Sequence, residues 1–256
     1  MTLLHTIILG IVEGLTEFLP VSSTGHMILV SHFLHIPEDV ALTTFEIAVQ
    51  VGAILAVVVT YYKKLFDIEM IKKLILAFIP TGVVGLFVFP YIKNLLTSPI
   101  IVASMLVLGG LCIIILEHRY EKQTEEGKII EIFNLSYKNA FILGVLQSLA
   151  IIPGVSRSGA MIMGGLVMRL SRTMVTQFTF LLAVPTMIVA TVYTLIKKHS
   201  QLSMDDLSLI VIGSSIAFVV ALVVIRVFLE YIRRHSFQVF GWYRIIVGII
   251  LLFVLV

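Results

Sequence analysis

The sequence predicts an all-α, polytopic membrane protein: an inverted-topology repeat with six transmembrane spans and two re-entrant helix–loop–helix hairpins. Hydrophobic residues make up 59% of its 256 residues, charged residues 13%, and the mean hydropathy is +1.09. Soluble domains are only about half apolar. Two of the apolar stretches are interrupted by proline, glycine and serine, and these two stretches resemble each other.

A spanning helix needs roughly 20 mostly apolar residues. Stretches of this kind occupy residues 40–62, 74–92, 99–116, 174–196, 207–232 and 237–256. The first apolar stretch of the chain lacks an Ala-x-Ala-like cleavage site, so we expect no removable signal peptide and a mature chain that begins near Met1.

Two further apolar stretches, residues 6–36 and 139–170, contain the interruptions Pro20-Val-Ser-Ser-Thr-Gly25 and Pro153-Gly-Val-Ser-Arg-Ser-Gly159. Irregular backbone at membrane depth is tolerated only where protein buries it or where it lines a wet cavity. Both stretches are therefore interpreted as re-entrant hairpins.

The two hairpins are related by an offset of 134 residues. This offset pairs Gly10 with Gly144, Glu13 with Gln147, Leu15 with Leu149, Ser22 with Ser156, Gly25 with Gly159 and Met27 with Met161. Chance similarity of apolar segments is the alternative. We expect one domain, 1–256, made of two repeats, about 1–116 and 139–256, joined by a solvated cytoplasmic linker, 117–138. An odd number of crossings per repeat would invert the second copy, as in several transporter folds.

Loop charges predict the orientation. One side carries Lys63, Lys64, Lys72, Lys73, Arg119, Lys122, Lys128, Lys138, Arg169, Arg172, Arg233 and Arg234, whereas the other carries Lys93, Lys197 and Lys198. Because cytoplasmic loops are enriched in Lys and Arg, both termini and the first hairpin are expected to face outward.

The first hairpin contains two carboxylates, Glu13 and Glu17, within an apolar run. A charge at membrane depth is costly and is usually functional. The two residues share a helix face, so their charges repel unless a proton, an arginine or a metal ion lies between them. Pro20 is expected to end this helix.

Ser22 or Ser23 can cap the next helix, which would place Ser23 and His26 on a shared face. A hydroxyl beside an imidazole is the minimum arrangement for an activated nucleophile. Ordinary capping by Ser23 and an interior His26 with satisfied hydrogen bonds is the alternative.

The second hairpin contains Ser156, Arg157, Ser158 and Gly159 after a proline–glycine turn. Backbone N–H groups at a helix start can bind an anion, and the arginine fork suits phosphate oxygens. The segment is interpreted as a phosphate cradle. A structural ion pair of Arg157 with Glu13 or Glu17 is the alternative. The two interpretations are compatible when no ligand occupies the site.

If the two loops meet, carboxylates, a hydroxyl, an imidazole and a guanidinium share one cavity. Glu13 and Glu17 would suit Mg²⁺ or Ca²⁺, since Mg²⁺ is often held by one or two carboxylates and substrate phosphates. This set predicts phosphoryl transfer to Ser23 or to water. The substrate would be partly lipid.

Other polar residues are less informative. Gln50 and Gln177 are candidates for the cavity wall, and interhelical hydrogen bonding explains them equally well. Glu46 is a further candidate, since it lies one helical turn before Gln50. Arg172 is interpreted as an anchor or a second anion contact. Trp242 and Tyr243 resemble an interface belt, and snorkelling explains Arg226 and Arg244.

The segments Glu13-Gly-Leu-Thr-Glu-Phe-Leu-Pro-Val-Ser-Ser-Thr-Gly-His26, Pro153 to Gly159 and Phe180-Leu-Leu-Ala-Val-Pro185 resemble the bacterial undecaprenyl-diphosphate phosphatase family, also called bacitracin-resistance proteins. The resemblance implies an integral membrane hydrolase of the bacterial cell (inner) membrane, with a divalent cation. It would release phosphate from undecaprenyl diphosphate, recycling the lipid carrier of peptidoglycan synthesis, and its site would open to the outer face.

The resemblance implies Glu17, Ser23, His26 and Arg157 as catalytic residues. Substrate binding would then involve Glu13, Ser22, Ser156, Ser158 and Gly159. The chain departs from the family pattern where Met161 replaces a usual threonine and Gln177 a usual glutamate, so no role in chemistry is assigned to either.

Alternatives to an enzyme remain. A polyprenyl-phosphate transporter or flippase would share inverted repeats and broken helices, but it needs no nucleophile beside Glu13 and Glu17. A structural scaffold would leave the buried charges unexplained. No basic patch with interleaved aromatics is present, so nucleic-acid binding is not expected. Membrane lipids are expected partners, and a homodimer is as compatible with the sequence as a monomer.

Overall fold

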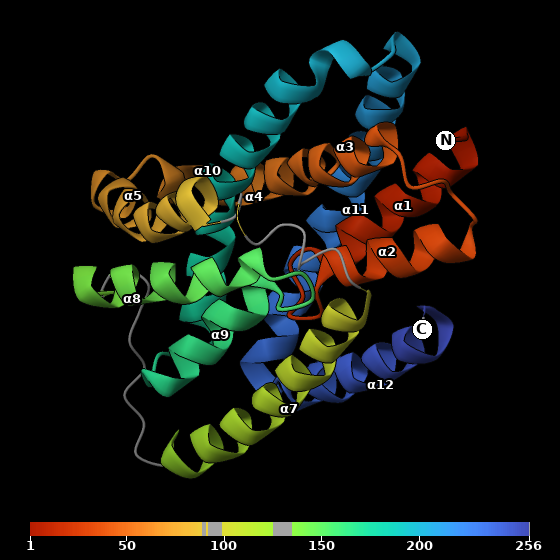
Figure 1. Cartoon of the computed structure of the whole chain (residues 1–256). Coiled ribbons are helices and arrows are strands. Elements are labelled where there is room, and N and C mark those ends of the chain that lie inside the picture. Colours follow the sequence, from red (N-terminus) through yellow and green to blue (C-terminus); the bar gives the residue numbers. More distant parts are fainter. Residues whose placement is uncertain (89–90, 92–98, 125–134, 256) are drawn as a thin grey trace.

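In the computed structural model, residues 1–88, 91, 99–124 and 135–255 are described. They form helices and connecting turns without a β-strand (Figure 1). The expected all-α class is confirmed. Lys93, Lys128, residues 125–134 of the linker and the ends of the expected spans 74–92 and 237–256 lie outside the described residues.

The structure describes fourteen helical elements, counting the short η segments. In chain order they are α1 Leu3–Thr16, α2 Ser23–Phe33, α3 Val40–Ala48, α4 Gln50–Leu65, α5 Ile68–Val83, η1 Val84–Val88, α7 Pro99–Thr124, α8 Tyr137–Gln147, η3 Ser148–Ile151, α9 Arg157–Val167, α10 Arg172–Lys198, η4 His199–Gln201, α11 Met204–Arg234 and α12 Gln238–Leu255.

Among the described residues, five helical segments are long and apolar enough to cross a membrane. They are Val40–Leu65, Ile68–Val88, Ile100–Tyr120, Arg172–Lys198 and Met204–Arg234. The sixth expected span, 237–256, corresponds to α12, whose apolar part Gln238–Val254 belongs to the shorter apolar helices. Five of the six expected spans are therefore matched by helices of spanning length.

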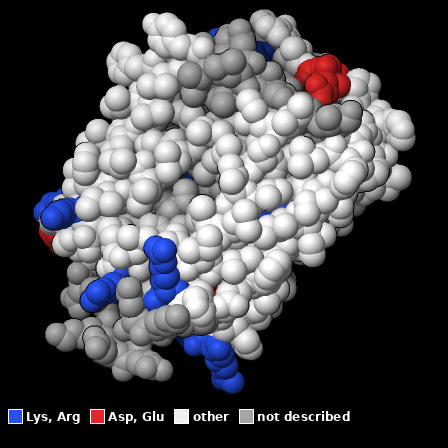
Figure 2. Space-filling view, turned by 60° about the horizontal axis from the view of Figure 1, so that its bottom comes forward, with Lys and Arg blue, Asp and Glu red and all other residues white. Residues whose placement is uncertain are grey.

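The surface of these helices is apolar where a soluble protein would be polar. Along α11, Val211, Val219, Val223 and Val227 are each at least 60% exposed. Figure 2 shows a broad uncharged face, with Lys, Arg, Asp and Glu mainly toward its edges. Extended apolar surfaces of this kind mark contact with lipid or another protein. Together with the five spanning segments, they identify a multi-pass membrane protein.

The two interrupted stretches form helix–loop–helix segments. Helix α1 packs against α2, and α8 packs against α9. In Figure 1 the α1–α2 pair and the α8–α9 pair approach from opposite sides, and their connecting loops lie next to each other near the centre. The architecture therefore brings together two loops that are more than 130 residues apart in the chain.

The two helix–loop–helix segments share an unusual backbone conformation at two positions, one in the loop and one after the second helix. Ser22 and Ser156 have φ values of 70° and 68°, and His35 and Arg169 have φ values of 52° and 60°. Positive φ is uncommon for residues other than glycine. Each pair is separated by 134 residues, the offset found in the sequence.

The helix ends repeat with the same offset. The Ser22 hydroxyl accepts a hydrogen bond from the Gly25 N–H, and the Ser156 hydroxyl accepts one from the Gly159 N–H. Farther along, the Ile36 N–H donates to the Ser31 carbonyl, and the Leu170 N–H donates to the Gly165 carbonyl. Each cap and each helix end of the first segment thus has a counterpart in the second.

Small residues allow helices from different parts of the chain to approach closely. A Cβ atom at Gly10 of α1 would lie 2.8 Å from the Gly213 carbonyl oxygen of α11. A Cβ atom at Gly144 of α8 would overlap the Ala77 carbonyl oxygen of α5. Helices α7 and α12 run side by side. Close packing through glycine is typical of helix pairs in membranes.

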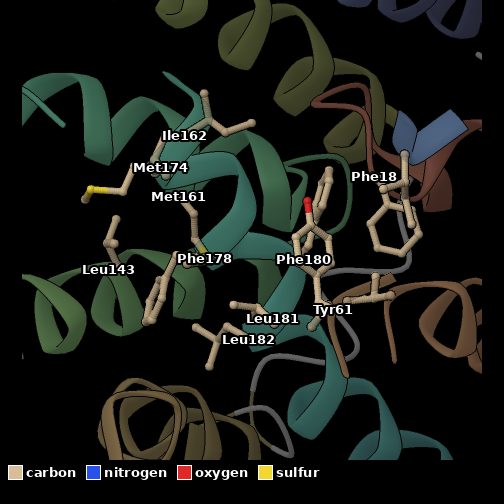
Figure 3. Packing of buried hydrophobic residues seen from close by; sticks show 14 of the residues in the cluster. Phe18, Tyr61, Leu143, Met161, Ile162, Met174, Phe178, Phe180, Leu181 and Leu182 are labelled. Atoms are coloured by element: carbon tan, nitrogen blue, oxygen red, sulfur yellow. The ribbon is translucent and has the colours of Figure 1, made fainter. Parts of the chain in front are cut away.

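An aromatic core supports the turn after α1 (Figure 3). Phe18 is fully buried, and its ring meets Phe180 of α10 edge-on, with ring centroids 4.9 Å apart. Phe180 in turn contacts Phe228 of α11. In a chain surrounded by lipid, packing of this kind stabilises through van der Waals contacts. Because Phe18 follows Glu17 directly, this packing holds the Glu17 backbone in place.

Candidate active site

Glu17 stands at the C-terminal end of α1. The helix ends at Thr16, four residues before Pro20, and Glu17 is its C-cap, with its N–H bonded to the Glu13 carbonyl oxygen. The expectation that Pro20 ends this helix was wrong by one turn. The two carboxylates are therefore one turn apart, with Glu17 facing the loop.

Arg157 joins the two loops. Its Nη2 atom lies 2.9 Å from Oε1 of Glu17, and both side chains are at least 92% buried. Arg157 is the first residue of α9, so the ion pair links the end of α1 to the start of α9. The pairing that was the alternative for Arg157 is thus present. Two of Arg157's nitrogen atoms, Nε and Nη1, are buried without a hydrogen-bond partner among the described residues.

The Ser23 hydroxyl is held by the same carboxylate. Its Oγ atom donates a 2.6 Å hydrogen bond to Oε2 of Glu17. We expected Ser23 beside His26, but the His26 ring contacts other groups. Nδ1 lies 2.8 Å from the Ser22 carbonyl oxygen, and Nε2 lies 2.7 Å from the Tyr243 hydroxyl. The base next to Ser23 is therefore Glu17, because the loop turns the imidazole away.

The contacts of His26 define its neutral tautomer. A carbonyl oxygen only accepts hydrogen bonds, so Nδ1 carries the proton and donates to Ser22. The lone pair of Nε2 then accepts a hydrogen bond from the Tyr243 hydroxyl. The two rings are also stacked, with centroids 5.4 Å apart and planes 4° apart.

The serines of the second loop are partly engaged within the protein. Ser156 Oγ accepts from the Gly159 N–H and lies 3.1 Å from Ser158 Oγ. Ser158 Oγ donates to the Leu19 carbonyl oxygen at 2.8 Å. Ser158 therefore ties the second loop to the first, and it does not line the cavity described next.

A cavity of ≈ 80 Å³ lies between the loops. Its polar wall consists of Glu17, Ser22, Ser23, Thr24, Gln50, Ser156 and Arg157. Its apolar wall includes Ala150, Ile152, Pro153 and Met187. A buried water needs only about 10–15 Å³ of such space, so the cavity has room for several waters or a polar ligand group. Of the expected residues, Glu13, His26, Ser158 and Gly159 are not part of this wall.

Glu13 is fully buried and does not line the cavity. Neither of its carboxylate oxygens has a hydrogen-bond partner among the described residues, and it lies in electrostatic range of Glu17 and Arg157. Buried polar atoms normally have partners. Within the described part of the chain no group of three or more His, Cys, Asp or Glu side chains could hold a metal. Only a cation bound by one or two carboxylates together with substrate oxygens fits these residues, as is common for Mg²⁺.

Some secondary candidates lie elsewhere. Gln50 lines the cavity as expected, whereas Gln177 accepts a 2.8 Å hydrogen bond from Lys64. Glu46 lies 3.5 Å from Ser31 and is not part of the cavity wall. Met161 is fully buried in the core. Each of these three residues is accounted for by packing or by a local polar contact.

Arg172 of α10 forms an ion pair with Glu117 of α7. Its Nε atom donates a 2.6 Å hydrogen bond to Oε1 of Glu117, which is fully buried. Glu117 also accepts from the Phe237 N–H. The expectation of a solvated linker from residue 117 was therefore wrong at this residue, because α7 continues to Thr124 and buries Glu117.

Comparison with known proteins then identifies the family. The family described as "Bacitracin resistance protein BacA" matches residues 6–250. This chain belongs to the BacA family. Curated relatives named undecaprenyl-diphosphatase include one from Persephonella marina, 50% identical over 257 residues with 100% of each chain covered. Another, from Sulfurihydrogenibium sp., is 48% identical over 98% of each chain, and one from Aquifex aeolicus is 44% identical over 98% of this chain and 97% of its own.

In this BacA-family chain, two residues at the site were assigned to the membrane interface from sequence. Tyr243 contacts His26, and Arg244 is fully buried with all its hydrogen bonds to backbone carbonyls. Their partners are up to 224 residues away. A polar residue near the end of an apolar helix ordinarily anchors at the interface, so the local pattern carried no signal of these contacts.

Proposed function

We propose that this BacA-family chain hydrolyses undecaprenyl diphosphate to undecaprenyl phosphate and inorganic phosphate at the cavity between the two loops. One observation carries the proposal: Glu17 binds the Ser23 hydroxyl with one carboxylate oxygen and Arg157 with the other. Base, nucleophile and anion-binding group are thus joined at one point. The names of the relatives support hydrolysis and do not favour a transporter.

The contacts of Glu17 and Arg157 define the chemical step. Glu17 takes the proton of the Ser23 hydroxyl, and the oxygen attacks the terminal phosphorus of the diphosphate. The bond from that phosphorus to the bridging oxygen breaks, and the lipid monophosphate leaves. Water then releases phosphate from Ser23. The Nε–H and Nη1–H groups of Arg157, which have no hydrogen-bond partner among the described residues, would bind phosphate oxygens and stabilise the developing charge.

A variant of this step uses water as the nucleophile, with Ser23 orienting the substrate. Ser22 and Ser156, on the cavity wall, bind the diphosphate in either route. Ser158 and Gly159 support the phosphate cradle without lining the cavity. The Ser158 hydroxyl donates to the Leu19 carbonyl oxygen, and the Gly159 N–H donates to the Ser156 hydroxyl. An acid–base role for His26 would be indirect, because its ring lies outside the cavity wall, with Nδ1 on the Ser22 carbonyl and Nε2 on the Tyr243 hydroxyl.

A divalent cation, Mg²⁺ or Ca²⁺, would be held by Glu13 and Glu17 together with substrate phosphate oxygens. When bound, it supplies Lewis-acid stabilisation of the phosphate charge. Glu13 offers two oxygens with no other hydrogen-bond partner among the described residues, whereas both oxygens of Glu17 already contact side chains. Glu13 is therefore the more available ligand.

The membrane arrangement is proposed from the duplication. Two inverted repeats, about 1–116 and 139–256, each contain one re-entrant hairpin and three spans, with the sixth span formed by α12. The equal positive φ values at the 134-residue offset support this. With the Lys- and Arg-rich side in the cytoplasm, both termini and the site face outward. Labelling of Thr2→Cys and Arg233→Cys, each combined with Cys112→Ser, by an impermeant reagent would test the orientation; only Thr2→Cys is expected to react in intact cells.

Phosphate release from undecaprenyl diphosphate by purified protein in detergent, with and without Mg²⁺ or Ca²⁺, tests the function. We expect release by the wild type, at least 100-fold less with Glu17→Ala or Arg157→Ala, and none above background with Ser23→Ala if Ser23 is the nucleophile. A Ser23→Ala rate that is below wild type but still above background would favour water as the nucleophile. Wild-type protein that releases no phosphate with metal present would contradict hydrolysis and favour the carrier.

A further inference from the structure

We infer that α12 positions the active site through two consecutive residues: Tyr243 orients His26, and Arg244 holds the two loops together. The inference rests on the proposed hydrolysis of undecaprenyl diphosphate. Neither residue is part of the cavity wall. Both therefore act through other residues, and they are positioning residues.

Arg244 is fully buried, and its guanidinium donates to backbone carbonyl oxygens at distances of 2.8–3.3 Å. Nη1 donates to Pro20 and Val155, Nη2 donates to Gly154 and Met105, and Nε donates to Leu106. The partners belong to the first loop, the second loop and α7. One side chain thus connects three segments that are far apart in the sequence.

The number of these hydrogen bonds distinguishes the role of Arg244 from that of Arg157. A guanidinium has five N–H donors in a planar fork, and the five contacts of Arg244 use all of them. No donor is left for a phosphate. Arg157, in contrast, has two buried nitrogen atoms without partners among the described residues. The structure therefore assigns substrate binding to Arg157 and loop positioning to Arg244.

The loop contacts of Arg244 are equivalent in the two loops. Pro20 lies two residues before Ser22, and Gly154 lies two residues before Ser156. Arg244 binds the carbonyl oxygens of both Pro20 and Gly154, at 3.1 Å and 2.8 Å. It therefore sets the separation of the two capping serines that line the cavity, and with it the distance between Glu17 and Arg157.

Glycine makes the space for this guanidinium. A Cβ atom at Gly109 of α7 would overlap Nη2 of Arg244, and a Cβ atom at Gly159 of α9 would lie 3.1 Å from Nη1. Lysine could not replace Arg244, since it has three donors on a single nitrogen and no planar fork. The site thus requires both the arginine and the glycines around it.

Tyr243 acts on His26 by two contacts. Its hydroxyl lies 2.7 Å from Nε2, and its ring stacks on the imidazole. With Nδ1 held by the Ser22 carbonyl, the hydroxyl fills the remaining ring position. It can donate to neutral imidazole and accept from the charged ring, so it holds the ring in one orientation through a change of protonation.

Tyr243→Phe tests whether Tyr243 orients His26, since the substitution removes the hydroxyl and leaves the stacking ring. Loss of the one hydrogen bond from Tyr243 that helps hold His26 against the first loop is expected to lower kcat about tenfold, with KM within twofold of wild type. Trp242→Phe, at an exposed neighbouring position, is the matched control and should leave both constants unchanged. A Tyr243→Phe variant with kcat within twofold of wild type would overturn the assignment.

A second measurement does not need activity. The ¹⁵N resonances of the His26 ring, assigned by their loss in His26→Gln, should show a displaced Nε2 signal in Tyr243→Phe and an unchanged one in Trp242→Phe. An unmoved Nε2 signal in Tyr243→Phe counts against the contact. If the wild type releases no phosphate, the proposed function fails while this readout still decides the inference.

Arg244→Lys tests whether Arg244 holds the two loops together. Because both loops lose their common support, we expect a rise in KM and a fall in kcat, with kcat/KM at least 100-fold lower. Arg226→Lys, at an exposed arginine of α11, is the control and should be unchanged. If Arg244→Lys does not fold, Gly109→Ala displaces the same guanidinium and should lower kcat/KM about tenfold, whereas Gly85→Ala, in open space, should not. Folded variants with wild-type constants would overturn the role of Arg244.

Discussion

The Ser23 hydroxyl donates a 2.6 Å hydrogen bond to Oε2 of Glu17, and the other oxygen of that carboxylate lies 2.9 Å from Arg157. Glu17 is therefore the shared partner of the two loops. The hydroxyl reaches across the first loop, and the guanidinium comes from the second. This geometry makes Glu17 the residue whose change should affect both the base and the anion-binding group.

Glu17→Gln keeps the size of the side chain and removes its charge. A glutamine cannot take the Ser23 proton, and it leaves Arg157 without its buried counter-charge. Loss of a general base typically lowers the rate 10²–10⁴-fold, and we expect phosphate release to fall in that range. Glu46→Gln, at a carboxylate away from the cavity wall, is the control. More than a tenth of wild-type activity in Glu17→Gln would contradict this role.

Arg157→Ala should reduce stability as well as activity. Removing one partner of a buried ion pair typically costs about 3–5 kcal/mol, because the other charge is left buried and unpaired. Thermal unfolding in detergent would measure this as a lower Tm. Arg157→Lys keeps a charge near Glu17, so its Tm should fall less, while its activity should remain low since the planar fork is lost. Equal activity of Arg157→Lys and wild type would argue against phosphate binding by the fork.

Glu13→Gln should change the metal requirement more than the stability. The Glu13 oxygens have no hydrogen-bond partner among the described residues, so removing the buried charge breaks no such contact and is expected to leave Tm unchanged or raised. The Mg²⁺ concentration for half-maximal phosphate release should rise at least tenfold. Titration of EDTA-treated protein with Mg²⁺ measures it. An unchanged Mg²⁺ requirement would remove Glu13 from the proposed cation site.

Gly144→Ala should lower stability although alanine is the better helix former. The added Cβ atom would overlap the Ala77 backbone of α5, and overpacking of this kind typically costs about 1–3 kcal/mol. Gly85→Ala has no atom within 4 Å of the new Cβ and serves as the matched control. Thermal unfolding of both variants checks the prediction; a Tm for Gly144→Ala at or above that of Gly85→Ala would show that α5 and α8 do not pack so closely.

The sequence predicted the helical class, most of the spans and both loop segments, because these depend on local properties. Apolar runs of sufficient length favour spanning helices, and proline, glycine and serine interrupt them. The charges in Glu17 and Arg157 also stand out in apolar surroundings, where an unpaired charge is costly. Their pairing could therefore be anticipated as an alternative before any coordinates.

Other predictions from the sequence were wrong because they used only local features. Glu117 looked like the start of a solvated linker, although Arg172 and the Phe237 N–H hold it in the interior. Ser23 and His26 looked like a couple from their spacing, but the positive φ of Ser22 and the contact with Tyr243 turn the imidazole elsewhere. Spacing along a helix gives the face of a side chain, but not the direction in which its ring points.

The sequence alone was enough to single out Glu13, Glu17 and Arg157, since burying these charges in an apolar chain has a large energetic cost that only mutual contact or a ligand offsets. Folding in three dimensions was needed to choose among their partners. Tyr243 and Arg244 look like interfacial residues along α12, and only the packing of α12 against α7 and the two loops turns them inward, where hydrogen bonds to His26 and to five carbonyl oxygens become available.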